Sequence, residues 1–374
     1  MTEEIRATEP PVAAATEVEA STVEKIGSHP PEQPIEAQTT TAPDQTTEPA
    51  GATKPEEKTK APVATEPALP ELVNAQWGPV SPPLAAIYRK LPEIFERGGA
   101  HNEVFGVTLV YDKDSTSPDF GTLLILQKFL RANSNNLEKA VEQLASTLKW
   151  RQEKKPLESL AVEYDREAFE GLGYVQVINS TGEVLTWNIY GAVKSYKKTF
   201  GNLEQFLNWR VALMEAAIAK LNLTTATKPI PDFGKGDDPY QIAQIHDYLN
   251  VSFLRQDPDV KVASKAAPAL FSSYYPEMLS RKFFVNVPLV MGWLYKAITL
   301  VLPATTVKKF KVMSYGKELH TELGDEVPEI YGGKGAKELK DLGEPLKLTE
   351  ATAPVVTTEP ETTAVPDAPA APTA

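Results

Sequence analysis

The chain has 374 residues, contains no cysteine and carries a formal net charge of −12. The absence of cysteine excludes disulfides and thiolate metal sites. Residues 1–70 hold 13 acidic and 5 basic residues, and residues 349–374 hold 4 acidic and no basic ones, so the remaining segment is neutral. A central segment without excess positive charge argues against nucleic-acid binding.

Both ends of the chain are rich in Pro, Thr, Glu and Ala and poor in large apolar residues. Such segments cannot bury enough apolar surface to offset the entropy lost on ordering. We therefore expect residues 1–75 and 349–374 to be disordered tails. The N-terminal sequence is acidic and lacks an apolar run, so we expect no secretory signal.

The folded part is expected to begin with a helical region over residues 80–160. Apolar residues at helical spacing predict a helix over Pro82–Arg97 and a second over Gly121–Ala132. Asn135 is the expected N-cap of a third helix, which ends at Pro156.

Short β-rich runs then alternate with helical stretches over residues 161–345. The expected strands are YVQVI, VLTWNIY, IAQIHDYLNV, FFVNV and FKVM, and the expected helices are Leu203–Leu221, Ala263–Tyr274 and Pro288–Val301. This alternation predicts an α/β fold with a mainly parallel sheet. Parallel sheets are usually covered by helices on both faces, so polar side chains on one strand face suggest that the face borders a ligand.

One expected strand carries His246 and Tyr248 two positions apart. Because strand side chains alternate, these two point to the same side, whereas Ile245, Leu249 and Val251 fall mostly on the other. A polar pair on an otherwise apolar strand predicts a lined cavity. The alternative from spacing alone is that Tyr248 is a core tyrosine whose hydroxyl has a protein partner.

The segment Phe283–Pro303 is apolar enough to be compared with a membrane span. It contains Asn286, Pro288 and Lys296, and a charge near its middle makes crossing a bilayer costly. We therefore do not expect it to span a membrane.

Catalytic chemistry finds little support in the sequence. His101 and His320 have no ligand-like spacing and are expected at the surface. GGKG at 332–335 lacks the spacing of a phosphate loop, so its glycines are expected to serve turns. No nucleophile–base pair and no GxSxG motif is found, so we expect no enzyme and no catalytic residue.

Several motifs resemble those of a known family. FLRA at 129–132, the helix ending in KWRQE, YYPEMLSRKFFVNVP at 274–288, TVKKFKVM at 306–313 and VPEIYGGKG at 327–335 are similar to CRAL-TRIO lipid-binding proteins. TWNIYG at 186–191, WRVALME at 209–215 and IHDYLNVSFLR at 245–255 resemble the fungal non-classical phosphatidylinositol transfer proteins. The resemblance implies a helical N-terminal region, then a mixed, mainly parallel sheet flanked by helices, with a gating helix over an apolar pocket.

The resemblance also implies a function. It implies a non-enzymatic protein that binds phosphatidylinositol and transfers it between membranes, cytoplasmic and peripheral on endoplasmic reticulum or microsomal membranes. The same group resembles a haem-binding protein, which implies haem b in the same domain. A second interpretation stays open, in which the protein is primarily a haem protein of a redox or oxidant-stress response with little lipid transfer.

The resemblance assigns the haem to particular residues. Tyr248 would be the axial ligand of the iron, a role that phenolates fill in other haem proteins. Arg210 and Lys282 would supply positive charge or pair with the propionates, and His246 would lie near the iron. Tyr190 is a further candidate.

Two more residues join Tyr190 on its expected strand face. Thr186 and Asn188 alternate with apolar neighbours and would also look into the cavity.

The lipid site implied by the resemblance rests on other residues. The gating helix is expected over Pro288–Val301, and its apolar residues would meet acyl chains or the bilayer: Val290, Trp293, Leu294, Ile298 and Leu300. Lys296 falls where family members place a headgroup lysine. Its acidic partner is not evident, since Ala266 and Ala267 lie near the matching place. The alternative is that this helix is packed in the core.

Overall fold

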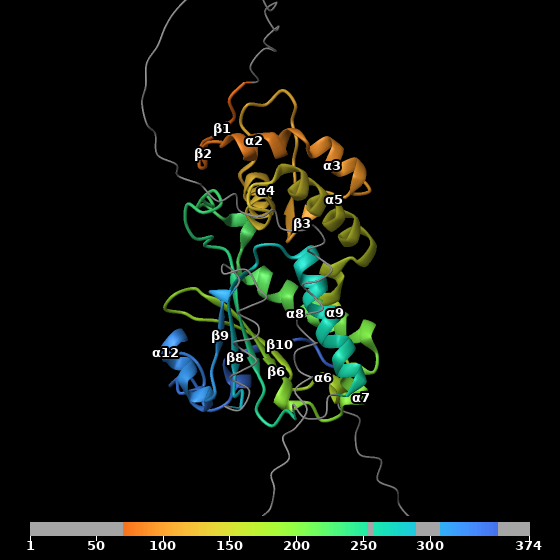
Figure 1. Cartoon of the computed structure of the whole chain (residues 1–374), viewed down its shortest axis with the longest axis vertical. Helices are drawn as coiled ribbons and strands as arrows, with labels where there is room; N and C mark the ends of the chain where they lie inside the picture. The colour runs from red at the N-terminus through yellow and green to blue at the C-terminus, as the bar shows by residue number, and fades with distance from the viewer. Residues whose placement is uncertain (1–69, 253–256, 289–306, 351–374) are drawn as a thin grey trace, which may run out of the picture.

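A computed structural model of the chain describes residues 70–252, 257–288 and 307–350. It places a helical region at one end of an α/β unit (Figure 1). The predicted tails lie almost entirely outside the described residues, as do the predicted helix Pro288–Val301 and its Lys296. The tail disorder, the gating helix and the domain boundaries therefore stay predictions.

The helical region is built from four helices and two small hairpins. They are α2 (Pro82–Arg89), α3 (Leu91–Arg97), α4 (Phe120–Ala132) and α5 (Leu137–Lys154), with hairpin β1 (Val73–Asn74) and β2 (Gly78–Pro79) and hairpin β3 (Glu103–Val104) and β4 (Val107–Thr108). The four helices lie near the positions that hydrophobic spacing predicts.

Two boundaries in this region differ from the prediction. The expected helix 82–97 divides at Lys90, because Pro92 in the first turn of α3 has no N–H to continue the hydrogen-bond ladder. The N-cap of α5 is Asn136, whose side chain accepts the Lys139 amide at 3.0 Å. The predicted cap Asn135 instead takes a left-handed backbone conformation, φ 63°, in the preceding turn.

The centre of the α/β unit is a six-stranded sheet in the order β10-β5-β6-β7-β8-β9. Its strands are β5 (Gly173–Val177), β6 (Val184–Ile189), β7 (Ile242–Asp247), β8 (Leu279–Val285), β9 (Phe310–Val312) and β10 (Glu344–Pro345). The pairs from β6 to β9 are parallel, and β5 is antiparallel to both neighbours. The predicted mixed, mainly parallel sheet is confirmed. Strand β10 was not predicted because two residues carry no periodicity.

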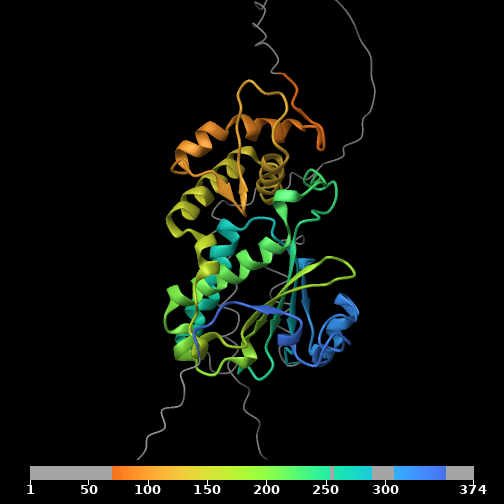
Figure 2. The same cartoon turned by 180° about the vertical axis from the view of Figure 1, so that it is seen from behind.

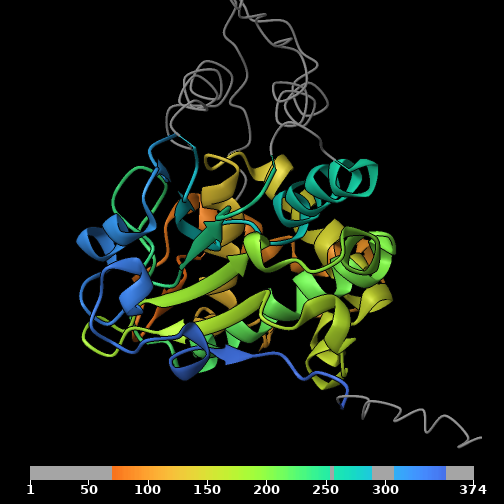
Figure 3. The same cartoon turned by 90° about the horizontal axis from the view of Figure 1, so that it is seen from below.

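Helices lie on both sides of this sheet, as Figures 1 and 3 show. One side holds α6 (Arg166–Phe169), α7 (Tyr196–Phe200), α8 (Leu203–Lys220) and α9 (Pro258–Tyr274). The other side holds α12 (His320–Leu323) and the 3-10 turns η5 (Gly316–Leu319), η6 (Glu329–Tyr331) and η7 (Leu339–Asp341). The described residues also form the 3-10 turns η1 (Pro156–Ala161), η2 (Tyr190–Ala192) and η3 (Leu223–Thr225).

Two hydrophobic cores follow from strand alternation. Leu185 and Trp187 of β6 and Ile245 of β7 are buried in the core that includes Leu319 and Tyr331. The residues between them on β6 and β7 therefore face the α8 side of the sheet.

Buried ion pairs attach the helical region to the sheet. The Lys128 ammonium of α4 donates to Asp238 at 2.7 Å, to the Tyr240 carbonyl at 2.7 Å and to the Glu277 carbonyl at 3.3 Å. These acceptors precede β7 and β8, so α4 lies at the amino ends of both strands. Figure 2 shows this arrangement from behind.

No helix in the described ranges is both long and apolar enough to cross a membrane. The segment Phe283–Pro303 lies partly outside those ranges, so the expectation that it does not span a bilayer stays a prediction.

Candidate ligand-binding site

Strand register brings the predicted polar residues together on the α8 side of the sheet. Asn188 of β6 pairs with His246 of β7, and Thr186 pairs with Gln244. Gln244 in turn pairs with Lys282 of β8. Side chains at paired positions project to the same face, so these five residues form one surface, here called the polar face.

The polar face carries buried polar atoms that lack hydrogen-bond partners. Thr186, Asn188 and His246 are each at most 6% exposed. Among the described residues, no partner is found for these buried atoms: Thr186 Oγ1, Asn188 Oδ1, His246 Nε2 and, from α8, Arg210 Nε. An unpaired buried polar atom costs about 1–3 kcal/mol, so such a cluster is expected where a ligand supplies the missing contacts.

Arg210 reaches this face from helix α8. Its guanidinium lies 5.5 Å from the ring centre of Phe271 of α9 and 6.0 Å from that of Trp209. Helix α8 packs closely on the sheet here, since a Cβ added to Gly173 would lie 2.6 Å from Trp209 Cζ2. Glycine at position 173 therefore allows α8 to pack this closely on β5, and this packing brings Arg210 near the polar face.

The positive charges of Lys282 and Arg210 both act on His246. Burial lowers its pKa well below the usual range, and the charges of Lys282 and Arg210 lower it further. The imidazole is therefore neutral at physiological pH. Two positively charged side chains, Lys282 and Arg210, therefore lie near a neutral imidazole, and such side chains can contact an anionic ligand.

Aromatic rings border the polar face at the carboxyl ends of the strands. The Tyr190 ring lies 5.5 Å from the rings of both His246 and Tyr248, measured between centroids. Phe284 of β8 lies 5.8 Å from His246 and 6.3 Å from Tyr248. Phe284 and Phe310 also hold the Lys282 ammonium, at 4.9 and 5.7 Å from their ring centres.

The strand that carries His246 is shorter than predicted. Strand β7 ends at Asp247, so Tyr248 lies just beyond it and the expected continuation to Val251 was wrong. Leu249, expected on the apolar side, is 44% exposed. The Asp247 carboxylate accepts the Leu249 amide at 2.8 Å and bends the chain away from the sheet.

The structure nevertheless brings five of the predicted site residues close together. Tyr190, Arg210, His246, Tyr248 and Lys282 are linked by the ring contacts and charge effects described above. Their roles toward a ligand stay predictions, and Lys296 lies outside the described residues.

Sequence reasoning missed Gln244, Phe284, Phe310 and Phe271. Gln244 could have been found, because it lies two positions before His246 on the same strand. The phenylalanines carry no such signal, since an apolar residue on a strand or helix is expected in any core.

The remaining sequence signals agree with structural roles. Gly332 has φ 88° in the turn after η6, so the glycines of GGKG do serve a turn. His101 and His320 are both half-buried rather than fully at the surface. The described residues contain no group of three His, Asp or Glu side chains placed to hold a metal ion.

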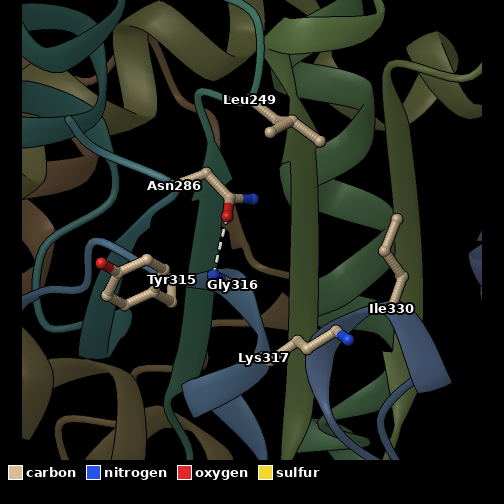
Figure 4. Close-up of a pocket in the computed structure, with 6 residues that line it drawn as sticks. All are labelled: Leu249, Asn286, Tyr315, Gly316, Lys317 and Ile330. Carbon is tan, nitrogen blue, oxygen red and sulfur yellow. Dashed lines mark hydrogen bonds between the residues drawn. The ribbon is translucent and has the colours of Figure 1, made fainter.

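A surface pocket of about 370 Å³ lies at the carboxyl ends of β7 and β8, on the side of η5 and η6 (Figure 4). It is lined by Leu249, Asn286, Tyr315, Gly316, Lys317 and Ile330. None of these is a predicted site residue, so this pocket is separate from the polar face. The predicted cavity over the polar face stays a prediction.

Comparison with known proteins defines the class. Residues 170–333 match the CRAL/TRIO domain. This range includes the polar face, Arg210 and the tyrosines at the strand ends.

The relatives narrow the class further. The chain is 50% identical over 283 residues to "Phosphatidylinositol transfer protein SFH5" of Phaeosphaeria nodorum, covering 73% of this chain and 82% of that one. It is 52% identical over 261 residues to the protein of the same name from Cryptococcus neoformans, covering 68% and 86%. A crystal structure of Sfh5 superposes with a TM-score of 0.60 at 30% identity, over 72% of this chain and 92% of that one. The chain belongs to the CRAL/TRIO family and, within it, to the SFH5 group.

Proposed function

We propose that the protein binds phosphatidylinositol and transfers it between membranes. The curated relatives carry the name of phosphatidylinositol transfer proteins. They are named as transfer proteins rather than as enzymes, which agrees with the expectation of a non-enzymatic carrier. The observation that carries the proposal is the polar face, where buried atoms of Thr186, Asn188 and His246 lack partners, in a fold shared with these relatives.

The chemistry of the polar face suits a lipid with an anionic headgroup. Arg210 and Lys282 supply positive charge for a phosphate, and Thr186 and Asn188 supply groups that hydrogen-bond to hydroxyls. Acyl chains would gain about 25 cal/mol for each Å² of apolar surface removed from water. Lys296 stays a proposed headgroup contact, on the strength of the family resemblance alone.

We further propose that haem b binds in the same domain, with Tyr248 as the axial ligand. The residues present fit such a group: rings of Tyr190 and Phe284 border the position, and Arg210 and Lys282 can pair with propionates. A porphyrin provides four of the iron ligands itself, so one protein donor suffices. When bound, haem would supply an iron centre tuned by its axial ligand.

The alternative proposal is a haem protein of an oxidant response with little lipid transfer. The unpaired Nε2 of His246 beside the tyrosine rings is the observation that favours it. Both proposals place the protein in the cytoplasm, peripheral on endoplasmic reticulum or microsomal membranes, which cell fractionation would test.

Two measurements on the purified full chain separate these proposals. Vesicle transfer assays with labelled phosphatidylinositol should show protein-dependent transfer, and an Arg210→Met variant should reduce it. Absence of transfer with intact folding would refute the lipid proposal. The absorption spectrum should show a Soret band that shifts or weakens in Tyr248→Phe, whereas Tyr315→Phe, an exposed tyrosine, should leave it unchanged. A colourless protein from haem-replete cells would refute the haem proposal.

A further inference from the structure

Asp247 is a buried carboxylate between the two residues at the centre of the proposed site. It is 3% exposed and lies between His246 and Tyr248 in the chain, on the opposite side of the sheet. The proposed binding site does not use it. A carboxylate at this depth must be held by donors, or it destabilises the fold.

Three donors from separate parts of the chain satisfy this carboxylate. Asp247 Oδ1 accepts the Leu249 amide and the Asn286 side-chain amide, each at 2.8 Å. Asp247 Oδ2 accepts the Tyr331 hydroxyl at 2.6 Å. Asn286 Oδ1 accepts the Gly316 amide at 2.7 Å, a bond drawn in Figure 4, which ties η5 to the same network.

Main-chain hydrogen bonds hold the backbone of Tyr248 on both sides. Its amide donates to the Val285 carbonyl at 3.1 Å, and its carbonyl accepts the Val251 amide at 3.0 Å. A Cβ on Gly191 would overlap the carbonyl oxygen of Leu249, so the segment after Tyr190 packs directly on the segment after Tyr248. Little freedom is left to the main chain that presents the two tyrosines.

The YGG motif, residues 331–333, positions Tyr331 for its hydrogen bond to Asp247. The Tyr331 ring packs 4.8 Å from that of Trp187, between centroids. Gly332 has φ 88°, and a Cβ there would overlap the Lys317 carbonyl oxygen, so glycine permits the turn that directs Tyr331 inward. Burial and the charge of Asp247 raise the pKa of Tyr331, so its hydroxyl stays protonated and donates.

We propose that Asp247 is a positioning residue, with Tyr331 and Asn286 as its donors, that fixes Tyr248 in the orientation facing His246 and Tyr190. The network lies on the side of the sheet opposite the polar face. The proposed positioning role rests on the proposed function, because that function makes Tyr248 a ligand contact. It also gives the YGG motif a role that neither lipid nor haem contact explains.

The test changes one member of the network at a time. Tyr331→Phe deletes the donor to Asp247 and keeps the ring, and Asp247→Asn keeps the shape but removes the negative charge. Tyr315→Phe is the matched control, because Tyr315 is 60% exposed next to Gly316. Haem affinity of both network variants should fall about 10- to 100-fold, the usual effect of losing a partner that orients a ligand residue. The Soret band should shift in the same direction as in Tyr248→Phe.

A second readout needs no haem. In the ligand-free chain, hydrogen exchange of the amides of Tyr248, Leu249 and Val251 should accelerate in Tyr331→Phe. Amides of β6 serve as an internal reference and should not change. If the wild type is colourless while these amides accelerate, the haem proposal fails and the positioning role stands.

Two outcomes would overturn the positioning role. One is a wild-type spectrum and affinity in Tyr331→Phe while Tyr248→Phe changes both. The other is unchanged exchange of the three amides. Should Asp247→Asn fail to fold, Tyr331→Phe decides alone, because it removes a single oxygen atom.

Discussion

At the scale of single residues, the site is defined by polar groups whose positions are costly without a ligand. Asn188 is fully buried on the sheet, and its side-chain oxygen Oδ1 has no hydrogen-bond partner. Arg210 lies between aromatic rings, and its Nε has no partner either. His246 is the clearest case, because burial and two cations all oppose its protonation. Its charge state therefore links the stability of the ligand-free protein to pH.

Proton binding by the unfolded chain sets the direction of this pH dependence. An unfolded histidine titrates near pH ~6.5, whereas the folded His246 holds its pKa well below this value. Between the two, the unfolded state binds more protons, so stability is present above about pH 6.5 and falls as the pH drops. We expect His246 to contribute a loss of up to about 1.4 kcal/mol per pH unit.

Urea unfolding of the ligand-free chain between pH 7 and pH 5 measures this effect. His246→Gln should remove the part of the pH dependence that His246 contributes. The control His320→Gln, at the first residue of α12, should retain that part. An identical slope in wild type and His246→Gln would contradict the assignment of a neutral buried imidazole.

At the scale of elements, the close approach of α8 to β5 sets where Arg210 lies. Phe169 stacks on Trp209 at 5.0 Å between ring centres, and Trp209 covers Gly173. Asn202 is the N-cap of α8, and its side chain accepts the Gln205 amide at 3.1 Å. Cap and packing together fix the rotation of α8 that directs Arg210 at the sheet.

Gly173→Ala tests this packing. Its Cβ would lie 2.6 Å from Trp209 Cζ2, so the indole or the helix must shift, and we expect a loss of about 1–3 kcal/mol in the free energy of unfolding. Val177→Ala on the exposed end of the same strand should change stability by less than about 0.5 kcal/mol.

The double variant Gly173→Ala with Trp209→Phe identifies the cause. If the clash with the indole is responsible, the double variant should be more stable than the sum of the single losses predicts. Strict additivity would assign the effect to the strand itself.

At the scale of the whole molecule, buried charges join the helical region to the α/β unit. Arg151 of α5 donates to Glu215 of α8 at 2.7 Å and to Glu103 at 2.9 Å. The Tyr275 hydroxyl donates to the same Glu215 oxygen at 2.7 Å. With Lys128 and Asp238, these contacts make independent unfolding of the two regions unfavourable.

Arg151→Met should therefore destabilise the whole molecule. Losing the guanidinium leaves the buried Glu215 uncompensated, which costs about 3–5 kcal/mol. The exposed pairs of Arg97 are worth at most about 1 kcal/mol, so Arg97→Met is the control. Calorimetry should show one transition at lower temperature in Arg151→Met; two separated transitions in the wild type would contradict the coupling.

The acidic tails give a prediction at the same scale. Deleting residues 1–69 and 351–374 removes most of the net charge and leaves every contact described above. We expect the shortened chain to keep its melting temperature within a few degrees and to transfer phosphatidylinositol at an unchanged rate. A vesicle transfer assay that shows loss of transfer would assign the tails a role in membrane contact.

Much of the fold follows from local patterns in the sequence. Hydrophobic spacing located α4, α5, α8 and the strands β5 to β9, because the apolar residues of each segment recur with the period of its own helix or strand. Boundaries were less accurate where short-range effects compete, as at Pro92 and at the Asn135–Asn136 turn. Strand β7 was predicted too long, because the hydrogen bond from the Leu249 amide to Asp247 ends it, and alternation does not report such bonds.

The sequence by itself determined that His246 and Tyr248 are unusual and that the chain resembles CRAL-TRIO proteins. Only the tertiary structure decided which residues join them. Register aligned Gln244 and Lys282 with Thr186, and packing brought Arg210 and Phe284 to the same face. The contact between Asp247 and Tyr331, 84 positions apart, likewise has no local signal. Long-range pairing depends on how the elements pack together, and a pattern within one segment does not specify its partner.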